Sequence, residues 1–317
     1  MRDAFARGLY TLAEHHEDVF LVTGDLGFGV LNAYRERFPR QYLNAGIAEQ
    51  AMTGIAAGMA FEGHVVFTYS IGNFPTFRCL EQIRNDCAYH NANVKIVSVG
   101  GGFAYGALGM SHHATEDIAV MRALPGVTVF TPGDPYEVEA LMPLVYQTPG
   151  VCYLRLGRGS EPRVHPSPPE NLKVGQAIKI YGGTQGAVFS AGGILPECEK
   201  AVSALRSEGF DIALYAHPTV KPLDEALIKS IADEVPFIVT AEEHTVLGGF
   251  GGAVAEVTAG MRGSRAFIER VGLADCYSAV VGSQAYLRAY YGLNSHHIAK
   301  TIRLCLDRAS RGDSYGA

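Results

Sequence analysis

Short runs of apolar and β-branched residues alternate with helical patterns through the first half of the chain. The runs are apolar throughout, not only at every second position, which is typical of parallel strands covered by helices on both faces. The pattern therefore predicts an α/β fold built on a parallel sheet with crossover helices. The predicted strands are Val19–Val22, Val65–Thr68, Val94–Val99, Val127–Phe130 and Val151–Leu154.

One predicted helix carries a full set of start signals. Asp134 suits the N-cap, Pro135 the first helical position and Glu137 the third position of a capping box. These signals predict a helix over Asp134–Gln147.

A break in the pattern divides the chain. Gly157–Val174 is rich in glycine, proline, arginine and serine, and its prolines exclude regular structure. We therefore predict two consecutive domains, each a mostly parallel sheet flanked by helices, at residues 1–157 and 185–317, joined by a linker over residues 158–184. In the second domain, strands are predicted at Ala187–Ser190, Ile212–Tyr215, Phe237–Thr240 and Ala266–Glu269, and helices at Pro196–Glu208 and Gly252–Gly260.

The composition of the chain limits the kinds of binding partner and the cellular compartment that we expect for it. A length of 317 residues, 48% of them hydrophobic and 18% charged, fits two folded globular domains. The formal net charge of -6 comes without a long run of one sign, so neither nucleic acid nor a membrane surface is expected as a partner. The six cysteines form no C-x-x-C pair and follow no secretory leader, which indicates reduced thiols and a cytoplasmic location.

Several common site motifs are absent from the sequence. It contains no G-x-G-x-x-G, no Gly-Lys of a P-loop and no G-x-S-x-G. The sequence therefore gives no motif evidence for three common classes of protein: dinucleotide-binding dehydrogenases, P-loop NTPases and α/β-hydrolases.

A carboxylate opens an apolar helix after a turn of small residues. Glu49 follows Tyr42–Ala48 and precedes the predicted helix Gln50–Phe61. Such a glutamate can simply complement the helix dipole, a common role that contributes about 0.3–1 kcal/mol. Its neighbouring segments decide between this role and a chemical one.

The segment around Glu49 resembles the catalytic glutamate motif of the pyrimidine-binding domain of transketolases and 1-deoxyxylulose-5-phosphate synthases. Gly109–Asp117 resembles the G-x-T-H-Q segment of the same family, and the likeness continues through Met121–Gly126 and Thr131–Asp134. The order and spacing of these segments agree with the family, and the resemblance covers essentially the whole chain. It implies a thiamine-diphosphate-dependent enzyme, in which the protein tunes the cofactor through its surroundings.

The resemblance also implies roles for individual residues. Glu49 would contact the pyrimidine of the cofactor, and His112 would face the substrate carbonyl. Phe74 and Phe77 would lie against the pyrimidine ring, although both could equally be core residues. Asp25 would lie at the active-site interface, or could be an ordinary turn aspartate.

Two arginines resemble the family's phosphate site. Arg158 and Arg2 would bind an anionic substrate, because a guanidinium suits phosphate. Three family positions differ, however: Gly29 replaces a serine, Gly100 a phosphate-contacting histidine and Leu108 an aspartate. The resemblance therefore leaves a modified or nucleotide-linked ketose open beside a sugar phosphate.

The metal-binding half of the family's cofactor site is missing. Family members hold the diphosphate through Mg²⁺ or Ca²⁺ bound at a G-D-G motif, and this sequence has none. No metal site is expected in this chain, because the adjacent His112 and His113 are poor joint ligands. The chain also begins where a pyrimidine-binding domain begins. The resemblance thus implies a partner, the N-terminal-section subunit, in an α2β2 assembly.

We expect a subunit of a heteromeric transketolase that transfers a two-carbon ketol unit from a ketose to an aldehyde. The alternatives are the β subunit of a 2-oxo acid dehydrogenase and a decarboxylating ligase like 1-deoxyxylulose-5-phosphate synthase. A catalytically silent assembly partner is a third possibility. The presence of both Glu49 and His112 argues against it.

Overall fold

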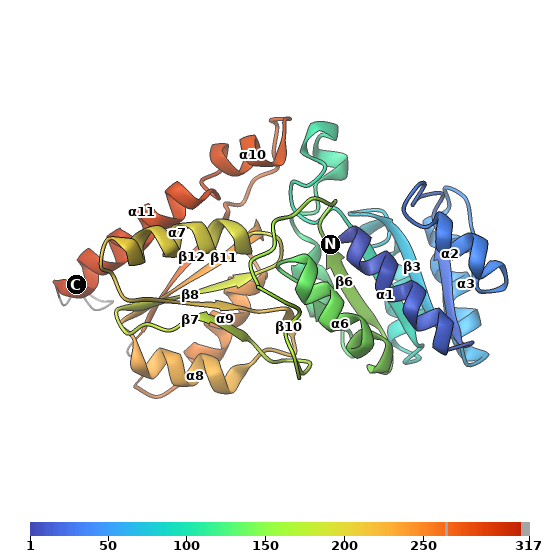
Figure 1. Cartoon of the computed structure of the whole chain (residues 1–317), viewed down its shortest axis with the longest axis horizontal. Helices are drawn as coiled ribbons and strands as arrows, with labels where there is room; N and C mark the ends of the chain where they lie inside the picture. The colour runs from blue at the N-terminus through green and yellow to red at the C-terminus, as the bar shows by residue number, and fades with distance from the viewer. Residues whose placement is uncertain (264–265, 312–317) are drawn as a thin grey trace.

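The computed structural model describes residues 1–263 and 266–311, which form two α/β units side by side (Figure 1). The first unit, coloured blue to green, and the second, yellow to red, each have a sheet between layers of helices. No helix of the described ranges is both long and apolar enough to cross a membrane.

The sheet of the first unit has seven strands in the order β10-β5-β6-β4-β3-β1-β2. All of its neighbouring strands are parallel except β10, which pairs antiparallel with β5. The five strands predicted for this domain are confirmed, whereas β2 and β10 were not predicted. The bounds are β1 Val19–Thr23, β2 Tyr42–Asn44, β3 Val65–Ile71, β4 Val94–Val99, β5 Thr128–Phe130, β6 Cys152–Leu156 and β10 Thr219–Lys221.

Alternate side chains of this sheet pack against different helices. Leu21 of β1 lies in a core with helices α1 and α6, and its neighbour Val22 lies in a core with α3 and α5. Burial on both faces explains why these strands are continuously apolar in sequence. The helices of this unit are α1 Arg2–His15, α2 Asn32–Arg37, α3 Glu49–Phe61, α4 Leu80–Gln82, α5 Asp117–Ala123 and α6 Pro135–Gln147.

The second unit has a five-stranded sheet in the order β12-β11-β8-β9-β7. Its four predicted strands are confirmed, and an unpredicted strand, β7, pairs antiparallel with β9. The strands are β7 Ile178–Tyr181, β8 Gly186–Ala191, β9 Ile212–Ala216, β11 Phe237–Thr245 and β12 Phe267–Leu273. The helices are α7 Leu195–Ser207, α8 Glu225–Glu234, α9 Phe250–Ala259, α10 Gln284–Tyr290 and α11 Ser295–Ser310.

The predicted helix at Asp134–Gln147 is confirmed as α6, with a variation at its start. The Asp134 carboxylate accepts a hydrogen bond from the Glu137 amide at 2.9 Å, as an N-cap should. The Glu137 carboxylate accepts from the amide of Gly133 at 2.6 Å, one residue before the position of a standard capping box.

The segment predicted as a linker, residues 158–184, differs from that prediction at its end. The proline-rich part is irregular, but Ile178–Tyr181 forms strand β7 of the second sheet. Strand β10 also belongs by sequence to the second half, although it extends the first sheet. One hydrophobic core further joins residues of both units, among them Val22 and Phe189. The two units are therefore interlocked and not merely tethered.

Candidate active site

Parallel topology gathers the candidate residues at one end of the first sheet. Asp25 follows β1, Glu49 follows β2, Phe74 follows β3, His112 follows β4 and Arg158 follows β6. The carboxyl ends of parallel strands lie at the same end of a sheet, which is where α/β folds bind ligands. This arrangement explains how residues so far apart in sequence come together.

Glu49 is the first residue of α3 and is buried, with 2% of its surface exposed. Its Oε1 accepts a hydrogen bond from Ser70 Oγ of β3 at 3.3 Å, and its Oε2 forms an ion pair with Arg78 Nη1 at 2.6 Å. The backbone at Gly24 closes the third side, because a Cβ there would lie 3.3 Å from Glu49 Cγ. The carboxylate is therefore fixed from three sides, and one partner, Arg78, is itself exposed.

Asp25 adopts a left-handed backbone conformation with φ of 55° directly after β1. Its carboxylate accepts from Asn44 Nδ2 at 2.9 Å, while Asn44 Oδ1 accepts from the amides of Asp25 and Gly46, each at 3.0 Å. Asn44 thus ties the end of β1 to the turn that leads into Glu49. It lies within the glutamate segment of the sequence, but its side chain chemistry alone does not reveal this role.

Arg78 links Glu49 to an aromatic side chain. Its guanidinium carbon lies 4.5 Å from the centroid of the Phe74 ring, within cation–π range. The Phe74 ring in turn meets His112 edge-on, with centroids 5.2 Å apart. Arg78 was not predicted as a site residue, because an arginine in a polar helical stretch carries no distinctive sequence signal.

A second aromatic continues this line toward Arg158. The centroids of His112 and Tyr105 are 6.5 Å apart, and the Arg158 guanidinium carbon lies 5.1 Å from the Tyr105 ring centroid. Three aromatic rings, Phe74, His112 and Tyr105, therefore lie between two arginines, Arg78 at the buried glutamate and Arg158 at the far end. We call this set the site row, and it comprises Glu49, Arg78, Phe74, His112, Tyr105 and Arg158.

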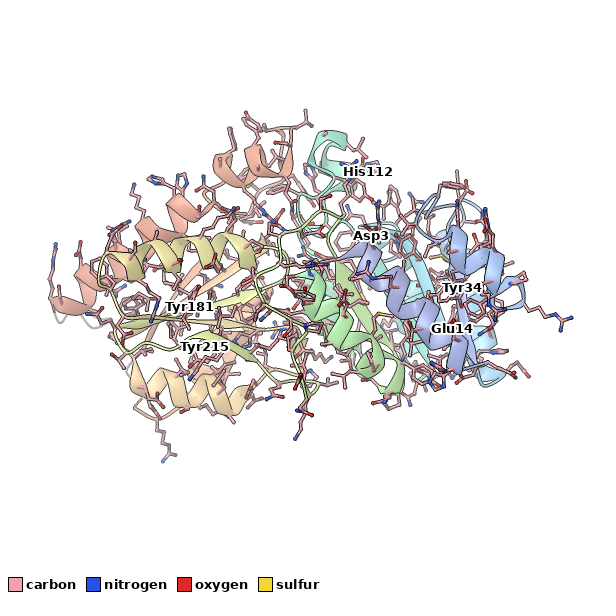
Figure 2. All side chains as sticks on the ribbon, viewed as in Figure 1. Asp3, Glu14, Tyr34, His112, Tyr181 and Tyr215 are labelled. Carbon is pink, nitrogen blue, oxygen red and sulfur yellow. The ribbon has the colours of Figure 1, made fainter. Side chains whose placement is uncertain are left out.

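His112 is the middle ring of the site row and ends the short 3-10 helix Met110–His112. Its label in Figure 2 lies on the side of the first unit next to α10, which is labelled in Figure 1. Its Nδ1 is 3.0 Å from Ser111 Oγ, and no hydrogen bond of its Nε2 is found among the described residues. Burial and the neighbouring His113 lower the pKa of His112 below its ordinary value. The imidazole is therefore neutral at neutral pH, with one ring nitrogen available to a ligand.

Phe77 is not brought into the site row. It lines a neighbouring cavity of about 440 Å³ together with Asn73, His113 and Tyr277. The imidazole of His113 is buried and packs edge-on against the ring of Phe103 at 5.1 Å. His112 and His113 thus face different surroundings.

Arg2 lies beside the Arg158 end of the site row. It lines a cavity of about 680 Å³ together with Phe28, Gly29 and Tyr34. A Cβ on Gly159 would come within 3.7 Å of Arg2 Nη2, which places Arg2 next to the turn that carries Arg158. The nearest carboxylate is that of Asp3, at 3.4 Å from Nε, and it is largely exposed.

Other charged groups near the boundary between the units are buried and paired with one another. Arg155 Nε donates to Asp117 Oδ2 at 2.7 Å, and its Nη2 donates to Asp117 Oδ1 at 3.2 Å. The same Nη2 donates to the carbonyl of Glu243 in the second unit at 3.0 Å. The Glu243 carboxylate accepts from the Phe103 amide at 2.6 Å and from Arg288 Nε at 2.8 Å. These groups join the two units.

A third buried cluster, Asp134, Glu137 and His165, has the composition of a metal site. Its groups are already hydrogen bonded, however: His165 Nε2 lies 2.8 Å from Glu137 Oε1, and the second Asp134 oxygen accepts from the amides of Val164 and His165 at 2.8 and 3.0 Å. The cluster therefore fixes the proline-rich segment to α6.

Comparison with known proteins identifies the family of the chain. Residues 1–162 match the family of the transketolase pyrimidine binding domain, and residues 175–298 match the transketolase C-terminal domain. The chain belongs to the transketolase family. Its resemblance to this family, its α/β fold and its two consecutive domain types are thereby confirmed.

Individual transketolase relatives align along almost the whole chain. One of the apulose-4-phosphate transketolase subunits of Phocaeicola vulgatus is 35% identical over 301 residues, which cover 95% of each protein. The 6-deoxy-6-sulfo-D-fructose transketolase subunit of Clostridium sp. strain MSTE9 is 29% identical over 97% of this chain and 95% of the relative. A solved structure described as a split gene transketolase, inactive beta4 tetramer, superposes with a TM-score of 0.87 at 30% identity, covering 96% of this chain and 98% of that one.

Transketolases depend on thiamine diphosphate, and the residues of this chain fit one end of that cofactor. The Glu49 carboxylate is buried and presents Oε2 to a partner, Arg78, whose side chain is 45% exposed and so can move. The half-buried Phe74 ring next to it offers an apolar surface of the kind that packs on a pyrimidine. The sequence contains no G-D-G motif to hold a metal and a diphosphate.

Proposed function

We propose that this chain is the pyrimidine-binding subunit of a two-subunit transketolase that moves a two-carbon ketol unit from an anionic ketose to an aldehyde. The observation that carries the proposal is the site row, which runs from a buried glutamate to Arg158, an exposed arginine for which the described residues provide no carboxylate partner. When bound, thiamine diphosphate supplies the nucleophilic carbon that accepts the ketol unit. The residues of this chain supply orientation and proton transfer.

Glu49 holds a proton between its carboxyl group and the ring nitrogen of the aminopyrimidine. Burial makes this contact strong, because few water molecules compete with it. Ser70 keeps one carboxyl oxygen fixed, so that the other points toward the ligand. Phe74 packs against the ring, and Arg78 orients the carboxylate before the ligand binds.

His112 exchanges a proton with the oxygen at the reacting carbon of the ketose. Its lowered pKa keeps the imidazole neutral near pH 7, so that Nε2 can accept a proton. The bond between Ser111 Oγ and Nδ1 orients the ring for this exchange. The row of three rings gives the substrate a flat wall, with an arginine at each end.

Arg158 and Arg2 bind the anionic end of the ketose. A guanidinium binds phosphate or sulfonate oxygens through two parallel hydrogen bonds. Two relatives are named for a phosphorylated and a sulfonated sugar, which supports an anionic substrate here. Asp25 and Phe77 complete the surroundings of the cofactor in this proposal, with Asp25 acting through Asn44.

The remaining half of the site comes from an N-terminal-section subunit. That subunit holds the diphosphate through a divalent metal, Mg²⁺ or Ca²⁺, and joins this chain in an α2β2 complex. The relative described as a split gene transketolase supports division of the enzyme into two chains. All six cysteines are free, five of them buried, which fits action in the reducing cytoplasm.

Reconstitution with a partner chain that carries the G-D-G motif tests the proposal. The mixture is expected to elute as one complex on size exclusion and to transfer a glycolaldehyde unit from a ketose to an aldehyde. Glu49→Gln should lower kcat by about 10²- to 10⁴-fold, the range lost when acid–base help is removed. Its elution volume and thermal unfolding should stay close to wild type.

Two competing reactions are measured in the same complex. Decarboxylation of a 2-oxo acid would favour the dehydrogenase alternative, and condensation of pyruvate with an aldehyde would favour the decarboxylating ligase. Ketol transfer by this chain alone would contradict the divided site. Full activity of Glu49→Gln would remove the glutamate from the mechanism.

A further inference from the structure

The ring of Tyr105 occupies space that only a glycine at position 100 leaves open. Gly100 has φ of +96°, and a Cβ at this position would lie 2.2 Å from Tyr105 Cδ2 and 2.3 Å from Cε2. Its amide donates to the Leu156 carbonyl at 2.8 Å, which holds the backbone in place between β4 and β6. The ring is therefore seated in a notch of the backbone and not on an adjustable surface.

The guanidinium of Arg158 lies over the ring of Tyr105, 5.1 Å from its centroid. Arg158 is exposed, and within residues 1–263 and 266–311 it makes neither an ion pair nor a hydrogen bond. Its guanidinium stacks on Tyr105, which leaves its N–H groups around the ring plane free to bind an anion.

The hydroxyl of Tyr105 is also free. The described residues provide no hydrogen bond to it, and the side chain is only half-buried. Burial raises the pKa of Tyr105, and this outweighs the opposing charges of Arg158 and Arg2. The group therefore stays protonated at neutral pH and offers one O–H donor. Arg158 lies over the ring, and Arg2 lies beside the turn that carries Arg158.

We infer that Tyr105 determines specificity for the far end of the ketose by donating its hydroxyl to a tetrahedral oxyanion, a phosphate or a sulfonate, that Arg158 and Arg2 bind. This inference rests on the proposed function and deepens it by naming a further residue that selects for the anionic end of the substrate. A ketose whose carbonyl end lies at His112 passes along the Tyr105 ring, and its terminal oxyanion then reaches the guanidinium of Arg158.

Removal of the hydroxyl alone gives the first test. In the reconstituted complex, Tyr105→Phe should raise KM for a ketose phosphate roughly tenfold, as expected for a lost hydrogen bond to a charged group. The change with an uncharged ketose such as erythrulose should be much smaller. Inorganic phosphate and methanesulfonate, titrated calorimetrically into the complex, separate the two oxyanions without relying on turnover.

Displacement of the ring gives the second test, with a matched control. Gly100→Ala forces the ring out of its notch and should weaken binding of both oxyanions at least as much as Tyr105→Phe does. Gly126→Ala introduces comparable backbone strain, with φ of +73°, at an exposed turn where a Cβ meets nothing within 4 Å. It should leave oxyanion binding and the ketose preference unchanged.

The outcomes separate this inference from the proposed function. A wild-type complex without ketol transfer contradicts the proposed function itself. A complex that transfers ketol units but shows the same KM ratio of charged to uncharged ketose in wild type and in Tyr105→Phe overturns the specificity role alone. A larger loss for phosphate than for methanesulfonate in Tyr105→Phe identifies the phosphate as the ligand of the hydroxyl, and the reverse identifies the sulfonate.

Discussion

The site row and the buried ion pairs between the two units use the same residue types in opposite ways. In the interior, Arg155 is 4% exposed, and its guanidinium bonds to Asp117 and to two backbone carbonyls. In the site row, Arg78 is 45% exposed and pairs with a single carboxylate, and Arg158 has an aromatic ring as its partner. The buried arginine, paired with a carboxylate, stabilises the fold. The exposed arginines of the site row are less completely neutralised and remain available to bind a ligand.

The difference shows where each kind of charge acts. A buried pair that loses one partner leaves an uncompensated charge in a medium that cannot solvate it. A partly exposed pair at a site can exchange its partner for a ligand at little cost, because water screens the intermediate arrangement. Mutations in the two regions should therefore affect different measurements.

The largest effect on stability is expected at the interior pair. Asp117→Asn leaves Arg155 buried without its counter-charge, and it should lower the free energy of unfolding by about 3–5 kcal/mol. Chemical denaturation followed by circular dichroism measures this change. The exposed pair of Lys229 and Glu225, 2.8 Å apart, is the matched control, and Glu225→Gln should cost less than about 0.5 kcal/mol. Equal losses would show that burial does not distinguish the two regions.

Arg78→Gln should lower activity more than stability, the reverse of Asp117→Asn. The variant loses the ion pair to Glu49 and the stacking on Phe74, so the carboxylate is no longer oriented before the ligand binds. We expect kcat/KM of the complex to fall about tenfold, equivalent to about 1.4 kcal/mol of transition-state stabilisation. The free energy of unfolding should change by less than about 1 kcal/mol, since the arginine is partly exposed. A variant with full activity and a large loss of stability would place Arg78 among the structural pairs.

The smallest effect is expected from the pH dependence of the His165 cluster. Burial lowers the pKa of His165, but its hydrogen bond to Glu137 and the nearby carboxylates outweigh burial and raise it. A raised folded-state pKa contributes stability below the unfolded value of about 6.5, and this contribution is lost as pH rises through the folded value. The free energy of unfolding of wild type should therefore exceed that of His165→Gln by about 1 kcal/mol near pH 5.5, and the difference should be smaller at pH 9. Chemical denaturation at the two pH values measures it. A difference that grows with pH would mean that the cluster is held by a neutral histidine.

The sequence predicted those parts of the fold that have a strong local signal. All nine predicted strands and the helix start at Asp134 are confirmed, because continuous apolar runs and capping residues act locally. The short strands β2, β7 and β10 were missed, since three or four residues carry too little pattern and their pairing is set by distant segments. The site showed the same limit. The resemblance indicated Glu49 and His112, whereas Arg78 and Tyr105 become visible only through their neighbours in space.

Strand β10 makes the first sheet depend on a segment from the second half of the sequence. It comes from the second unit, yet it covers the edge of β5 in the first sheet, with Thr219 opposite Phe130 and Lys221 opposite Val129. A fragment that stops after β6 would expose the unpaired backbone of β5, and exposed strand edges promote aggregation. The sheet that carries the site row is therefore completed only when the ribosome has also made the first part of the second unit, through Lys221.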